Sequence, residues 1–93
     1  MRAPAVLDLF PPGSSVGADG TLSVAGCRLD DLAEQFGTPV MVVAEDAVRA
    51  RAREYLAAFR SRWPHTEVAF ASKAFPCTAI QRLMSQEGLL LDV

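Results

Sequence analysis

Two hydrophobic periods alternate along this chain from residue 39 onward. The run "PVMVVA" at 39–44 is continuously apolar and rich in valine, which is typical of a parallel strand buried on both faces. The stretch 45–63 places its apolar residues on one face of a long helix, and 67–72 returns to a strand pattern. A second helix is expected at 77–88 and a last strand at 89–93. This order predicts a parallel α/β fold.

The first part of the chain has a weaker pattern. Residues 1–20 are rich in Pro, Gly, Ser and Ala and predict an irregular leader, and a short strand follows at 21–24. Within 29–36 the apolar residues recur at helical spacing, and Asp31 with Glu34 resembles a capping box. We therefore expect a small strand and a short helix before the α/β pattern begins.

Polar and glycine residues suggest where the helices begin and end. Asp46 and Thr78 are expected as the N-caps of the long helix and of the second helix. Gly37 and Gly88 follow the ends of two helices, where a left-handed backbone conformation favours glycine.

The composition excludes several classes of partner. The chain has 93 residues, 22% of them charged, with a formal net charge of −2, so it has no basic surface for nucleic acid or anionic membrane. No apolar run has the length of a membrane span, and the start of the chain makes a poor signal peptide, so we expect a cytoplasmic protein. Cys27, Cys77 and His65 are too scattered to predict a metal site.

Lys73 stands at the end of the apolar strand pattern "EVAFASK". Side chains alternate along a strand, so Lys73 is expected on the same face as Ala69 and Ala71. These small neighbours leave room for a bound molecule beside the amine. In β/α barrels, catalytic residues collect at this carboxyl end of the strands.

The chemistry of an amine at that place admits two interpretations. An amine at the mouth of an apolar barrel is partly desolvated, which lowers its pKa and makes it a nucleophile toward aldehydes. The matching partner is pyridoxal phosphate (PLP), held as a Schiff base, whose ring accepts electrons from a carbanion at a substrate Cα. The alternative is a lysine that ends its strand by extending the ammonium group into water. The pattern alone favours this second interpretation.

Longer stretches of the sequence favour the first interpretation, in which Lys73 binds PLP. The segments "FGTPVMVV" and "VAFASKAFPCTAIQRLMSQEGLLLDV", separated by an arginine-rich helix, resemble the amino-terminal part of diaminopimelate decarboxylases. These are PLP enzymes related to alanine racemase and to the ornithine/arginine decarboxylases. The resemblance covers residues 29–93, and the order and spacing of its pieces make it specific.

The resemblance implies a fold and a set of roles. Residues 37–93 would form the first β/α units of a PLP-binding β/α (TIM-type) barrel, and residues 1–36 would contribute to a separate β domain. Lys73 would hold PLP, and Asp92 falls where the family has an acidic residue near the cofactor. Phe75 stands where family members commonly have Asn, so it is expected to alter the pocket beside Lys73.

The implied activity is decarboxylation of meso-diaminopimelate to L-lysine and CO2 by a homodimeric enzyme. Such a barrel needs about 250 residues, so this chain is expected to be an amino-terminal fragment that is inactive by itself. The sequence leaves two alternatives open. One is a decarboxylase of the same fold that acts on another basic amino acid, and the other is a non-catalytic PLP-binding protein.

Overall fold

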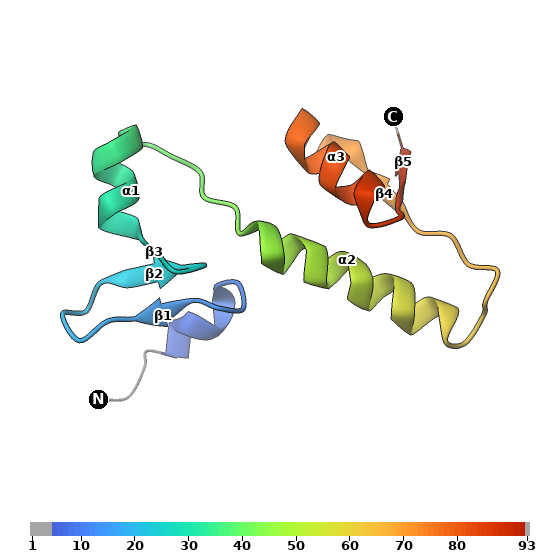
Figure 1. The fold of residues 1–93 in the computed structure, drawn as a ribbon, viewed down its shortest axis with the longest axis horizontal. Coiled ribbons are helices and arrows are strands. Elements are labelled where there is room, and N and C mark those ends of the chain that lie inside the picture. The colour runs from blue at the N-terminus through green and yellow to red at the C-terminus, as the bar shows by residue number, and fades with distance from the viewer. Residues whose placement is uncertain (1–4, 93) are drawn as a thin grey trace. The chain divides into compact units, whose positions relative to one another are not determined.

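A computed structural model describes residues 5–92 (Figure 1). The chain divides into two compact units between Ala47 and Val48, near the start of helix α2 (Glu45–Arg60). The predicted domain boundary, at residues 36 and 37, concerns the complete fold and stays a prediction.

The first unit contains a small antiparallel sheet (Figure 1). Its elements before the first α-helix are η1 (Ala5–Leu9), β1 (Ser15–Val16), β2 (Leu22–Val24) and β3 (Cys27–Arg28). The strands pair in the order β1-β2-β3, and the Gly17 N–H donates to the Thr21 carbonyl at 2.9 Å to close the first hairpin. The prediction of an irregular leader is therefore wrong for residues 5–20, because this turn brings β1 against β2; residues 1–4 lie outside the described part.

Arg28 connects the first hairpin turn to the start of α1. Its Nη2 donates to Asp19 Oδ2 at 2.8 Å, to Asp30 Oδ2 at 2.9 Å and to Thr21 Oγ1 at 3.1 Å. The hydrogen bond from Arg28 is the main cause that lowers the pKa of Asp19 to about 2. All three charged side chains are about half exposed, so water screens these pairs and they fix local geometry more than they stabilise the fold.

Helix α1 (Leu29–Phe36) confirms the predicted short helix but not its cap. The N-cap position is Arg28, which makes no side-chain capping bond. The capping box predicted at Asp31 is wrong because the helix begins two residues before it. At the other end, Gly37 has φ +79° and its N–H donates to the Ala33 carbonyl at 2.8 Å, as expected for a glycine after a helix.

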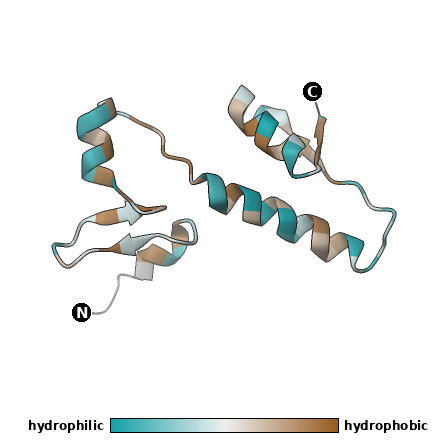
Figure 2. Ribbon diagram, in the orientation of Figure 1, coloured by the Kyte–Doolittle hydropathy of each residue, from teal (hydrophilic) through white to brown (hydrophobic). Residues whose placement is uncertain are grey.

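The valine-rich segment between α1 and α2 is not a strand. Figure 2 shows it as a continuous apolar stretch of the ribbon. Its large side chains are exposed, from 40% for Val42 to 78% for Met41. A strand needs the backbone groups of a neighbour, and no strand in residues 5–92 pairs with this segment. The strand predicted at 39–44 is therefore absent from the described structure.

Helix α2 carries an apolar face that is only partly covered. It begins at Glu45, one residue before the predicted cap Asp46. Ala52 and Leu56 are buried, as the predicted apolar face requires. The aromatic residues at the same spacing are at least half exposed: Tyr55 at 52%, Phe59 at 53% and Trp63 at 67%.

The second unit has the parallel strand pair that the sequence pattern predicts. Strands β4 (Ala69–Ala71) and β5 (Leu90–Asp92) are parallel neighbours, and helix α3 (Thr78–Gln86) connects them. Side chains from α2, α3 and the residue before β5 form one apolar core, made of Ala52, Leu56, Ile80, Leu83, Met84 and Leu89.

Both ends of α3 are defined by backbone geometry. Thr78 is the first helical residue and not the cap; the N-cap position is Cys77, which makes no side-chain bond. At the carboxyl end, Gly88 has φ +92°, and the Leu89 N–H donates to the Met84 carbonyl at 3.0 Å. This is a Schellman motif with an apolar contact across it, because both Leu89 and Met84 belong to the core. The predicted glycine stop is confirmed.

Glu87 joins the end of α3 to α2. Its Oε1 accepts from Arg53 Nε at 2.6 Å and its Oε2 accepts from Arg49 Nη1 at 2.9 Å. The Glu87 side chain is only 9% exposed. The two arginines differ in exposure, because the Arg49 side chain is 23% exposed and that of Arg53 is 69% exposed, although both reach from α2 to the residue that follows α3.

We predict that acid weakens this connection between α2 and α3. The hydrogen bonds from Arg53, and then from Arg49, lower the pKa of Glu87. The stabilisation is therefore complete above the unfolded-state pKa of about 4.3 and is lost as the pH falls through the lower folded-state value. In the protein that carries this segment, Glu87→Gln should reduce the urea midpoint of unfolding at pH 7, and the difference from the wild type should shrink toward pH 3.

Glu54→Gln is the matched control. Glu54 pairs with Arg51 at 3.3 Å, and both side chains are about two-thirds exposed, so this change should have little effect at either pH. Equal unfolding midpoints for the wild type and Glu87→Gln at pH 7 would contradict the assignment.

Candidate functional site

Lys73 lies just beyond the carboxyl end of β4. The strand ends at Ala71, and Ser72–Ala74 forms the 3-10 turn η2, closed by the Phe75 N–H donating to the Ser72 carbonyl at 3.1 Å. The expectation that strand alternation places Lys73 with Ala69 and Ala71 is therefore wrong, because the backbone has left the strand conformation before it reaches the lysine.

The register of the parallel pair brings both predicted site residues to one edge. Ala71 is the partner of Asp92 across β4 and β5, and it is the last pair that the structure describes. Because the strands are parallel, their carboxyl ends meet at the same edge, and Lys73 follows two residues after Ala71. Both Lys73 and Asp92 are exposed there. This edge is where ligands bind in open α/β sheets.

The amine of Lys73 is accessible. Among residues 5–92 it has no hydrogen-bond or ion-pair partner, and its neighbours Ala71 and Ala74 are small and exposed. Lys73 is also the only lysine in the 93 residues. A primary amine at the edge of the sheet fits an aldehyde cofactor such as PLP. The desolvation expected for it is not supplied by the described residues.

The residue that begins this turn and the residue that follows it are both shielded from solvent, fully or in part. Ser72 is only 6% exposed, and its Oγ is buried without a hydrogen-bond partner among the described residues. Phe75 is half-buried and packs against the core of the second unit. The expectation that Phe75 alters the pocket beside Lys73 stays a prediction.

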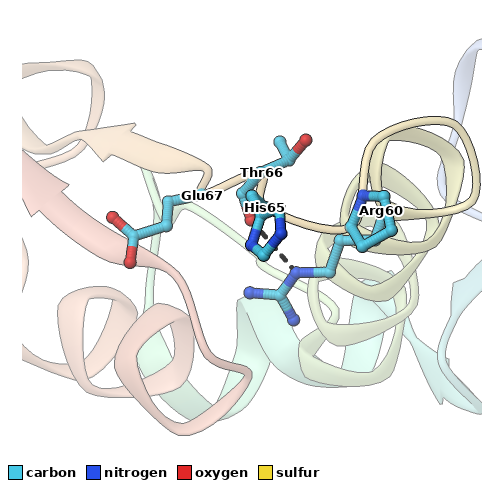
Figure 3. A pocket seen from close by; sticks show the side chains of 5 residues that line it. Arg60, His65, Thr66 and Glu67 are labelled. Carbon is cyan, nitrogen blue, oxygen red and sulfur yellow. Dashed lines mark hydrogen bonds between the residues drawn. The ribbon is translucent and has the colours of Figure 1, made fainter.

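An open hollow lies at the opposite end of β4. Pro64, His65, Thr66 and Glu67 line it together with Arg60, whose Nε donates to the Thr66 carbonyl at 3.2 Å (Figure 3). These residues precede β4, so the hollow is at the amino end of the strand and apart from the edge with Lys73. Arg60 already donates a hydrogen bond to the loop backbone, and we assign no role to the hollow.

Other chemistry is limited in the described part. Residues 5–92 contain no group of three His, Cys, Asp or Glu side chains that is placed to hold a metal ion. Cys27 and Cys77 are free thiols, the first exposed and the second half-buried. Within the same residues, no helix has the length and apolar character needed to cross a bilayer.

Comparison with known proteins bears on the role of Lys73 at the carboxyl edge of β4 and β5. No protein-family model matches the chain. A diaminopimelate decarboxylase of Actinosynnema pretiosum subsp. auranticum is 46% identical over 85 residues, which is 91% of this chain and 18% of that protein. The chain is similar in sequence to diaminopimelate decarboxylases. The resemblance recognised from the residues is thereby confirmed.

Further diaminopimelate decarboxylases extend this similarity. The protein of Corynebacterium efficiens is 47% identical over 75 residues, 81% of this chain and 16% of that protein. The protein of Synechocystis sp. is 36% identical over 87 residues, 92% of this chain and 19% of that protein. The chain thus spans less than one fifth of the length of the diaminopimelate decarboxylases it matches.

We predict that removal of the buried Ser72 hydroxyl stabilises the protein. A buried hydroxyl without a partner destabilises the fold by about 1–3 kcal/mol. In the protein that carries this segment, Ser72→Ala should therefore raise the free energy of unfolding by about 1 kcal/mol, measured by urea denaturation. Ser85→Ala, on the exposed face of α3, is the control and should change it by less than about 0.5 kcal/mol. A fall in stability on Ser72→Ala would show that the hydroxyl has a partner elsewhere in the protein.

Proposed function

We propose that this chain is an amino-terminal segment of a PLP-dependent diaminopimelate decarboxylase. The observation that carries the proposal is the placement of Lys73. The only lysine of the chain is exposed just past the carboxyl end of a parallel strand, within a stretch similar to diaminopimelate decarboxylases. The substrate would be meso-diaminopimelate and the products L-lysine and CO2.

The proposed architecture is the start of a β/α (TIM-type) barrel at 37–93, with residues 1–36 contributing to a separate β domain. The parallel pair β4 and β5, joined through α3, supports the barrel. The exposed valine-rich segment supports it as well, because its pattern is that of a strand buried on both faces. We propose that it becomes the first barrel strand in the complete protein, paired with neighbours and covered by them.

The residues of this chain have limited roles in the proposed reaction. Lys73 would hold PLP covalently through its amine, and Asp92 would contribute negative charge at the same edge. PLP supplies an electron sink for the carbanion left at the substrate Cα when CO2 departs. We propose that the residues which bind the PLP phosphate and select the substrate lie outside these 93 residues. They would belong to regions that correspond to the parts of the relatives which this chain does not span.

The same proposal implies a cellular location and an oligomeric state. The full-length protein would act on a free amino acid in the cytoplasm as a homodimer. The 93 residues alone would be inactive, because the valine-rich segment and the aromatic face of α2 stay exposed in them. A decarboxylase for another basic amino acid, or a non-catalytic PLP-binding protein, would be recognised by a panel of amino acids tested for CO2 release.

The proposal predicts that PLP attaches covalently to Lys73. After incubation of the full-length protein with PLP and reduction with borohydride, peptide mapping should find the cofactor on Lys73. Lys73→Arg keeps the charge but removes the primary amine, so it should abolish this adduct and lower CO2 release from meso-diaminopimelate by about 10²-fold or more.

Arg82→Lys is the matched control for nonspecific labelling. Arg82 is exposed on α3, so the change places a second accessible amine on the chain, and no adduct should form there. Turnover unaffected by Lys73→Arg, or reduction of PLP onto other lysines with equal yield, would rule out the proposed role.

A further inference from the structure

The turn that carries Lys73 is anchored at both ends and open in the middle. Ser72 is 6% exposed and begins the turn, whereas Lys73 and Ala74 are exposed. Phe75 follows the turn and packs against the core formed by α2 and α3. The lysine is therefore presented outward by a segment whose two ends point inward.

The backbone of this segment has few restraints of its own. Beyond Ala71 the described part of β5 offers no further ladder partner. Phe75 lies outside both helix and strand, with φ −157° and ψ 86°. Its N–H donates to the Ser72 carbonyl at 3.1 Å, and its own carbonyl accepts from the Cys77 N–H at 2.8 Å. Both hydrogen bonds join residues of the segment to one another, whereas the Phe75 ring packs against the core, so this side chain links the segment to the rest of the second unit.

We propose that Phe75 is a positioning residue for Lys73. Its ring fixes the Ser72–Ala74 turn to the core of the second unit and so sets where the Lys73 amine stands at the edge of the sheet. The inference rests on the proposed function in one respect, since PLP attachment at Lys73 is the chemistry that this positioning serves.

Phe70 provides a matched control. It is also half-buried and packs against the same core, so truncating either ring removes apolar contacts with that core. The backbone at Phe70 is held independently of its side chain, because β4 pairs there with Leu91 of β5. Phe75, by contrast, stands on a backbone segment that has no strand neighbour among residues 5–92.

The experiment compares Phe75→Ala, Phe75→Leu and Phe70→Ala in the full-length protein. Both alanine variants should lower the thermal midpoint of the PLP-free protein by similar amounts. Only Phe75→Ala should weaken PLP binding, by about tenfold or more, and slow the borohydride-trapped attachment at Lys73. Phe75→Leu, which retains an apolar anchor, should recover most of the wild-type affinity and remains measurable if Phe75→Ala fails to fold.

A second readout does not depend on PLP. Amide hydrogen exchange in the cofactor-free protein should become faster for residues 72–77 in Phe75→Ala and stay unchanged there in Phe70→Ala. Wild-type PLP affinity and wild-type exchange in Phe75→Ala would overturn the inference, as would equal losses in Phe70→Ala. If the wild type attaches no PLP to Lys73, the proposed function fails, while the exchange pattern still decides whether Phe75 holds the turn.

Discussion

The parallel pairing of β4 with β5 is the constraint on which the proposed site depends. It sets Ala71 beside Asp92, so two residues 19 positions apart along the chain, Lys73 and Asp92, reach one edge of the sheet. The pairing is maintained by α3, whose apolar face packs with Ala52 and Leu56 of α2. A shift of register by one residue would reverse the face of every strand side chain, so the packing against the helices determines the register as well.

A glycine and a charged residue stabilise the return of the chain into β5. Gly88 allows the left-handed turn after α3, and an added Cβ there would be strained at φ +92°. Glu87, one residue earlier, accepts hydrogen bonds from Arg49 and Arg53 of α2. The point where α3 ends is therefore fixed by backbone conformation and by charge together. From that point only Leu89 precedes β5, so the same contacts determine where Asp92 lies.

The sequence predicted the helices and the parallel pair because their patterns are local and strongly periodic. The prediction failed at 39–44. The apolar pattern there is that of a strand buried on both faces, and residues 5–92 provide neither a strand neighbour nor cover for it. The prediction also failed at Lys73, because a tight turn ends the strand alternation two residues early. The ion pairs of Glu87 and the packing of Phe75 against the core were missed because each depends on contacts between elements. Spacing along the chain carries no signal for a partner 34 or 38 residues away.

The most direct test of the central claim is a crystal structure of the full-length protein grown with PLP. The account predicts continuous density from the Lys73 Nζ to the cofactor, at the carboxyl edge of β4 and β5, with Asp92 at the same edge. It also predicts that the valine-rich segment is a strand in that structure. Cofactor density on another lysine, or at the amino end of β4 beside His65, would contradict the account.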